Sequence, residues 1–465
     1  MDSVLGITTL GVLMFSIDTT VVVIALPDIL DALHSNLVNM IWVLVSYTFA
    51  STVLLLSLGR VADIYGRVRL YNLGFAIFTV GSALSGLSQS DIQLIAARLL
   101  QGAGGALLLV NALAIITEVF PARQRGMALG INSMTFGIGA IIGPVLGGVI
   151  LTVASWPWIF YINVPIGIAG TYLAYRFLRP TPAQCRGEGL DIFGSLTFSF
   201  SLLSLLLALT LGSAAGWTSP LILTMLAAFT GLLGFFIFWE RRVEHPALDL
   251  GIFANRLFSF SVLAAMFQAL AIFSVQFLVV FYLQAVRGNS PLSAAFLLLP
   301  APVVQAIVGP LSGRVSDSIG ARIPATAGLL IQAIGIFLLS RITVSTPYLY
   351  IEIGLALTGL GAGLFFSPNT SAAMGAAPKR RLGVASATLA TFRNTGLVTS
   401  YALALAVAAA SLPLDVSLRL FLGTQVNLGP VLTEAFTQGM HAALVVSGII
   451  SLIGAGLSVV RGPRQ

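Results

Sequence analysis

Near-continuous apolar stretches, each long enough to cross a lipid bilayer, recur along the whole of this chain. A spanning helix needs roughly 20 apolar residues, and 465 residues with short connections accommodate fourteen such helices. Charged residues make up 8% of the chain, whereas a soluble domain carries roughly a quarter. We therefore predict an all-α polytopic membrane protein. The expected spans are 4–32, 40–58, 70–88, 92–116, 127–152, 159–178, 191–211, 220–239, 258–283, 292–312, 324–341, 349–375, 384–410 and 436–460.

The lysines and arginines gather in alternate connections between these spans. With the N-terminus inside, 18 of the 23 basic residues lie in inside segments. Arg287, Arg341 and Arg419 fall outside, and Arg98 and Arg393 lie within spans. Basic residues favour the cytoplasmic side, so we expect both termini in the cytoplasm and the chain in the plasma membrane. This bias also accounts for the net charge of +7 without a nucleic-acid partner.

An internal repeat divides the chain. GRVADIYGRVR at 59–69 follows the second span, and GRVSDSIGARI at 313–323 follows the tenth. The shared residues are Gly59, Asp63 and Gly66 in the first copy and Gly313, Asp317 and Gly320 in the second. An offset of eight spans, instead of six, predicts two inserted helices. The expected domains are an N-terminal six-helix bundle at 1–180, an inserted pair with cytoplasmic flanks at 181–257, and a C-terminal six-helix bundle at 258–465.

The first copy of the repeat predicts a gate. Gly59 lets two helices approach closely because it has no Cβ. Asp63 can accept hydrogen bonds from Arg67 or from a neighbouring helix N-terminus, where negative charge is favoured. With Arg69, this cluster could hold the inside ends of helices together, against the basic loop 379–381. The alternative is ordinary solvated loop charge.

Two charges lie inside predicted spans of the first half. Asp18 falls in the middle of the first span, where a carboxyl can bind a proton or a cation in alternation. Arg98 must face a cavity or a partner, and Gln101 lies on the same helix face. Two alternatives are open: Asp18 is a structural residue satisfied by Thr19 or Thr20, or Arg98 extends to the outer surface.

A glycine stripe marks the fifth span, in the segment GAIIGPVLGG at 139–148. Gly139, Gly143 and Gly147 recur every four residues, followed by Gly148, and form a smooth face for tight helix packing. Pro144 can act as a hinge. A purely structural role is the alternative to a role in sealing one state of a pore.

Other polar residues within spans are candidates to line a cavity, or to act as simple interhelical hydrogen-bonding groups. These are Tyr47, Gln101, Asn111, Gln268, Gln276, Asn369 and Arg393. Glu352 and Glu118 could be second coupling carboxylates, although interfacial solvation explains both. Three scattered histidines and a single cysteine, Cys185, predict no metal site, and no cofactor is expected.

These segments together resemble the major facilitator superfamily, and within it the fourteen-helix drug:proton antiporter branch, often called EmrB/QacA-type. The motifs that carry the resemblance are the inside-loop signature, the RxxQG segment, GPxxGG and DTTVV…ALP. Further similar stretches are WPWIFYINVPIG, EHPALDLGIFANRLF, YLQAVRGNSPLSAAFLLLP, GLGAGLFFSPN and GVASATLATFRNTG. The chain departs from the pattern at Pro157, where the family usually has Arg, and in having no acid between 384 and 410.

The resemblance implies two six-helix bundles plus two inserted helices, and an alternating-access secondary transporter. It further implies proton-driven export of small lipophilic, preferentially cationic, compounds, with Asp18 and Arg98 in coupling. Expected partners are the bilayer, a small-molecule substrate and protons, and the expected state is a monomer. Export of an amphiphilic lipid or an anionic metabolite is the alternative. A membrane enzyme is disfavoured because no catalytic set of polar residues is visible.

Overall fold

The computed structural model describes residues 2–35, 37–179, 191–244, 246, 248, 250–411 and 430–461, and within these ranges it contains helices and turns but no strand. The first half consists of α1 (Asp2–Ala32), α2 (Leu37–Tyr65), α3 (Arg67–Gly86), α4 (Asp91–Val119), α5 (Ala122–Val153), α6 (Trp158–Tyr161) and α7 (Asn163–Phe177). Next come α8 (Ile192–Ala215) and α9 (Pro220–Glu240). The second half consists of η1 (Leu250–Ala254), α10 (Arg256–Phe281), η2 (Tyr282–Val286), α11 (Pro291–Leu298), α12 (Pro300–Ile319), α13 (Arg322–Leu339), α14 (Tyr348–Ala376), η3 (Lys379–Arg381), α15 (Leu382–Ser411) and α17 (Pro430–Val460).

Local sequence signals set many of the helix starts. The side chains of Ser90, Asp191, Ser219, Asn255 and Ser290 each accept a backbone N–H in the first turn of the following helix. Such caps satisfy amides that have no partner within the helix. They place α4, α8, α9, α10 and α11 close to where the apolar patterning predicts spans.

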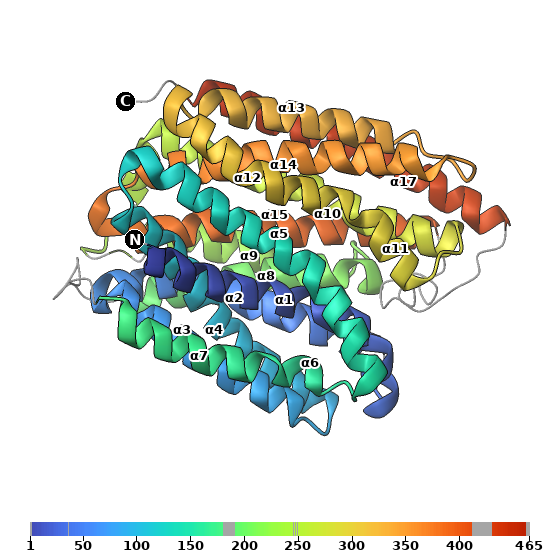
Figure 1. The fold of residues 1–465 in the computed structure, drawn as a ribbon, viewed down its shortest axis with the longest axis horizontal. Coiled ribbons are helices and arrows are strands. Elements are labelled where there is room, and N and C mark those ends of the chain that lie inside the picture. The colour runs from blue at the N-terminus through green and yellow to red at the C-terminus, as the bar shows by residue number, and fades with distance from the viewer. Residues whose placement is uncertain are drawn as a thin grey trace.

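The long helices run along one common direction, with α1–α7 forming one side of the molecule and α10–α17 the other (Figure 1). Large apolar side chains cover much of the outside, Val153, Ile168 and Ile307 among them. Ten helices of the described part are long and apolar enough to cross a membrane. The other four predicted spans overlap α3, α7, α10 and α15, and a total of fourteen crossings stays a prediction.

The pair α8 and α9 packs on both halves. The Ser199 hydroxyl donates to the Val53 carbonyl of α2 (3.2 Å), and Leu202 and Leu206 cluster with Val398 of α15. The pair therefore covers the seam between α2 and α15. The flank 180–190, including Cys185, and most of the predicted outer loop, residues 412–429, lie outside the described residues.

The two halves meet along α5 with α12 and along α2 with α15. We call the end of the bundle where α2 and α12 end and α5 and α15 begin the latch end, and the opposite end the far end. The start of α1 and the end of α17 also lie at the latch end (Figure 1). Small residues allow the contact there: Gly59 packs on Gly383 and Ala387, and Gly313 packs on Gly126.

Candidate functional site

A buried ion pair lies inside the first half, away from the seam. Asp18, from the middle of α1, is 0% exposed, and Arg98, from α4, is 1% exposed. Arg98 Nη1 donates to Asp18 Oδ2. The two charges that the sequence places within spans of this half therefore neutralise each other, which offsets the several kcal/mol that an isolated charge costs in a bilayer.

The Asp18 carboxylate is surrounded by donors. Gln101 Nε2 donates to Oδ1 (2.8 Å), and Asn163 Nδ2, from α7, donates to the same oxygen (3.0 Å). Gln101 Oε1 in turn accepts from Arg98 Nη1 (2.8 Å). Each of these three contacts uses a carboxyl oxygen as the acceptor, which suits the acceptor-only carboxylate form.

The two structural alternatives from the sequence do not match these contacts. Thr19 and Thr20 donate their hydroxyls to carbonyls one turn back in α1 (2.8 and 3.1 Å), so neither satisfies Asp18. The Arg98 side chain does not extend to the surface. Its guanidinium lies over the buried Tyr47 ring, with 4.4 Å from Cζ to the ring centroid. Tyr47 is thus part of the ion-pair cluster.

Asn163 is a member of the cluster that sequence reasoning missed. Its amide reaches both Asp18 and the hydroxyl of Ser82 in α3 (3.2 Å). The available signal was a single polar residue inside the apolar stretch WPWIFYINVPIG. Asn163 is the first residue of α7. With Tyr47 from α2, the cluster therefore joins five helices of the first half: α1, α2, α3, α4 and α7.

The glycine stripe of α5 packs against the turn of α1 that carries Asp18. A Cβ on Gly139 would lie 2.6 Å from Ser16 Cβ, and one on Gly143 would collide with Thr20 Oγ1. The Ser16 hydroxyl donates to the Phe136 carbonyl across the same contact (2.7 Å). The stripe therefore lies within the first half, where it determines how closely α1 and α5 approach.

The rest of that motif is less tightly held. Gly147 is buried, whereas a Cβ on Gly148 would meet no atom within 4 Å. Pro144 lies inside α5, which continues past it to Val153.

The first repeat copy forms what we call the first latch, made of Asp63, Arg67 and Glu118 with the start of α15. The Asp63 carboxylate accepts the backbone N–H groups of Gly383 (2.9 Å) and Val384 (3.0 Å). Both belong to the first turn of α15, where the helix dipole favours negative charge. Asp63 is 1% exposed, so solvated loop charge does not describe it.

Arg67 completes the first latch. It donates to Asp63 Oδ1 from Nη2 (2.8 Å) and to Glu118 Oε2 from Nη1 (2.6 Å). Nη2 also donates to the Lys379 carbonyl in the second half (3.0 Å). Glu118 thus belongs to the latch, and the basic loop 379–381 contacts it through a backbone carbonyl.

The second repeat copy forms the second latch, made of Asp317 with the start of α5. Asp317 accepts the N–H groups of Gly126 (3.0 Å) and Met127 (3.1 Å). The Ser367 hydroxyl donates to the Gly126 carbonyl (2.6 Å). Each half thus contributes one carboxylate to an early turn of a helix in the other half. The internal repeat of the sequence corresponds to a reciprocal pair of contacts.

Both latch turns end on a glycine that needs a left-handed backbone. Gly66 has φ of 101° and Gly320 has φ of 87°, a region that other residues rarely adopt. Arg69, by contrast, is exposed and makes no described contact with either latch. Glu352, half-buried in the first turns of α14, has no described hydrogen bond or ion pair to the latches or to Asp18.

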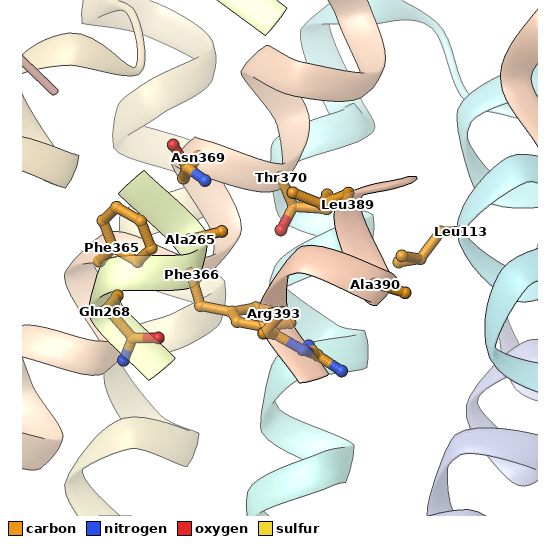
Figure 2. Close-up of a pocket in the computed structure, with 10 residues that line it drawn as sticks. All are labelled: Leu113, Ala265, Gln268, Phe365, Phe366, Asn369, Thr370, Leu389, Ala390 and Arg393. Carbon is orange, nitrogen blue, oxygen red and sulfur yellow. The ribbon is translucent and has the colours of Figure 1, made fainter. Parts of the chain in front are cut away.

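A small enclosed cavity lies where α4 faces α10, α14 and α15 (Figure 2). Three of the residues predicted to line a cavity, Gln268, Asn369 and Arg393, line it. The cavity volume is about 20 Å³, which is room for one water molecule. A drug-sized compound would therefore require the surrounding helices to move apart.

Two other residues predicted to line a cavity, Asn111 and Gln276, are not among the described residues that line this one. Asn111 is buried and donates to the Leu107 carbonyl of its own helix (2.8 Å). The Gln276 side chain lies outside the described residues, although its backbone is in α10. Within the part of the chain that the structure describes, no group of three His, Cys, Asp or Glu side chains could hold a metal ion.

Comparison with known proteins identifies the family. The family model described as Major Facilitator Superfamily matches residues 8–188 and 181–401. The riboflavin transporter RibZ of Clostridioides difficile is 33% identical over 393 residues, which is 84% of each chain. The multidrug resistance protein Stp of Mycobacterium tuberculosis is 33% identical over 404 residues, 87% of this chain and 75% of that protein.

A solved structure shares the fold. The crystal structure of the human organic anion transporter MFSD10 (TETRAN) matches with a TM-score of 0.68 at 15% sequence identity, over 98% of this chain and 99% of that chain. At this identity the likeness concerns the fold alone. The sequence relatives are transporters and not enzymes. The chain described here is accordingly a multi-pass membrane transporter that belongs to the Major Facilitator Superfamily.

Proposed function

We propose that this transporter is a proton-coupled antiporter that exports small lipophilic compounds by alternating access. The observation that carries the proposal is the ion pair of Asp18 and Arg98, buried inside the membrane-spanning part of the first half. Burying an ionisable residue at such depth costs free energy, and such residues commonly serve transport or proton transfer. Names of relatives such as the multidrug resistance protein Stp support the export of lipophilic compounds.

The ion pair supplies a physical route from protonation to movement. A proton on Asp18 would cancel its negative charge and leave the Arg98 guanidinium without its counter-charge. Breaking a buried pair in this way costs about 3–5 kcal/mol. A conformation in which α1 and α4 separate, and Arg98 finds other partners, would then become favoured. Proton binding thereby biases one of two states, which is the requirement for coupling.

The two latches indicate which conformation of the transport cycle the structure represents. Both tie one half to the other at the latch end. The excess of basic residues at this end supports a cytoplasmic location for it. Both termini would then be cytoplasmic, and the protein would lie in the plasma membrane. The state would then be closed to the cytoplasm, and the latches would open when the protein turns inward.

The finer architecture is part of the proposal. We assign the chain to the fourteen-helix branch, with bundles at 1–180 and 258–465 and the inserted pair at 181–257. Four helices besides the ten apolar ones overlap predicted spans. Helix α8 packs on the outside of the seam between α2 and α15, and α9 packs on α8. A monomer would be sufficient for transport, because both sides of each latch belong to the same chain.

The test is transport into proteoliposomes with an imposed pH gradient, using a small panel of cationic, neutral and anionic lipophilic compounds. An antiporter accumulates at least one compound when the lumen is acidic, and a protonophore abolishes the accumulation. Protein-free liposomes under the same gradient are the control. Gradient-independent equilibration of every transported compound would show a uniporter and would reject proton coupling.

A further inference from the structure

The small cavity of Figure 2, which we call the central cavity, contains one cation that has no anionic partner among the described residues. Arg393, in α15, lines the cavity, and in the part of the chain that the structure describes no hydrogen bond or ion pair reaches its guanidinium. Its described neighbours are aromatic: Cζ lies 5.2 Å from the Phe366 ring centroid and 5.9 Å from that of Phe136. Phe136 belongs to the first half and Phe366 to the second, so Arg393 lies at the seam between the halves.

The other arginines of the membrane-spanning part that have been described above are paired. Arg98 has the Asp18 carboxylate, and Arg67 has those of Asp63 and Glu118. Cation–π contacts such as those of Arg393 stabilise a guanidinium by about 0.5–2 kcal/mol, less than the several kcal/mol that a charge costs in a bilayer. Arg393 therefore retains a net attraction for an anion, and the cavity is where an anion could reach it.

Two of the other three polar lining residues, Gln268 and Asn369, are already engaged, and the third is Thr370. Gln268 Nε2 donates to Gln332 (3.2 Å), and Asn369 both donates to the Ser261 carbonyl (2.9 Å) and accepts from Arg461 (2.9 Å). Figure 2 shows the Arg393 guanidinium directed away from both of these amides. The charged donors for a ligand thus come from Arg393, with the Thr370 hydroxyl as a neutral donor, and none of the ten lining residues carries a carboxylate.

The chemistry of the cavity defines the ligand. A guanidinium has five donors and no acceptor, and it binds carboxylates and sulfonates in a bidentate manner. Apolar side chains, including Phe365, Leu389 and Leu113, form most of the rest of the lining. A cation would meet the like charge of Arg393. The buried carboxylate of Asp18, in the middle of α1, is enclosed by three donors.

We propose that the central cavity binds a lipophilic organic monoanion whose acidic group pairs with Arg393. This inference rests on the proposed transport function and deepens it by naming the substrate class. In the state described, the cavity has room only for a water molecule, so the acidic group would pair with Arg393 as the two halves move apart. The apolar part of the ligand would then lie between Phe136 and Phe366.

The test is equilibrium binding to the purified full chain in lipid nanodiscs, without a pH gradient. The probes are anilinonaphthalene sulfonate, a fluorescent lipophilic monoanion, and phenylnaphthylamine, the same ring system without the sulfonate. Arg393→Gln should weaken binding of the sulfonate about tenfold or more, as expected for the loss of a charge-assisted pair. Binding of phenylnaphthylamine should stay within about twofold, because the apolar lining is unchanged.

Two further variants make the result specific. Arg393→Lys keeps the charge and should retain part of the sulfonate affinity, since an ammonium lacks only the bidentate geometry. Arg341→Gln removes an exposed arginine outside the cavity and should change neither probe. Equal losses for both probes in Arg393→Gln, or an unchanged sulfonate affinity, would overturn the proposal.

A competition on the unmodified chain guards against a variant that fails to fold. A lipophilic carboxylate should displace anilinonaphthalene sulfonate, whereas its methyl ester should displace it about tenfold less well. Equal displacement by acid and ester, or displacement by chloride at the same concentration, would contradict the proposal. Because no gradient is applied, failure of proton coupling would leave all of these binding results in place.

Discussion

Substitution of Asp63 by Asn should loosen the first latch by an amount that can be worked from its contacts. Asp63 accepts two backbone N–H groups of α15 at 2.9 and 3.0 Å and pairs with Arg67 at 2.8 Å. A hydrogen bond to a charged group contributes about 1.5–3 kcal/mol net, and charge at a helix N-terminus about 0.3–2 kcal/mol. The Asn carbonyl can still accept one N–H.

We therefore expect Asp63→Asn to cost the latch-closed state about 2 kcal/mol, which shifts its equilibrium about 30-fold toward opening. The assay is double electron–electron resonance between spin labels at positions 65 and 319, in a Cys185→Ser background. Tyr65 is 54% exposed and Ile319 is 56% exposed, and they lie on different halves at the latch end. Asp63→Asn should add a longer-distance population.

The matched control is Asp91→Asn, which makes the same chemical change. Asp91 accepts from Ser35 and Asn39, both at 2.6 Å and both in the first half. It crosses no seam, so its substitution should leave the distance distribution unchanged. Identical distributions for Asp63→Asn and Asp91→Asn would refute the interpretation of the first latch as a bond between the halves.

Two further predictions concern stability. Asp18→Asn alone should lower the free energy of unfolding by about 3–5 kcal/mol, because it leaves Arg98 buried without its counter-charge. The double variant Asp18→Asn/Arg98→Gln should lose less stability, as measured by thermal unfolding in detergent. An equal or larger loss in the double variant would contradict the pairing. Gly143→Ala should cost about 1–3 kcal/mol, since the added methyl collides with Thr20. Gly148→Ala, which meets no atom within 4 Å, is its control, and the same loss in both variants would mean that the α1–α5 contact is not tight.

The sequence predicted the membrane character of the chain and its family because both depend on features repeated along it. Apolar stretches report the bilayer directly, and the comparisons confirm the superfamily. The repeat also indicated that Asp63 and Asp317 occupy equivalent positions in the two halves. The individual partners of the two carboxylates could not be predicted, since they are backbone amides, at Gly383 and Gly126, that carry no signature of their own.

The sequence also predicted only part of the ion-pair cluster. The cost of a buried charge predicted that Asp18 and Arg98 each need a partner, but not that they are partners of each other across 80 residues of chain. Asn163 joins them only because α7 packs beside α1 and α3. The aromatic neighbours of Arg393 come from α5 and α14, and their proximity depends on how the two halves meet.

The most direct test of proton coupling through Asp18 compares two transport modes in the same proteoliposomes: accumulation driven by a pH gradient, and substrate exchange without one. The account predicts that Asp18→Asn, alone and with Arg98→Gln, loses gradient-driven accumulation but retains exchange. Glu352→Gln, which removes a carboxylate outside the ion-pair cluster, should keep both. An Asp18→Asn protein that still accumulates substrate in full proportion to the gradient would contradict the central claim.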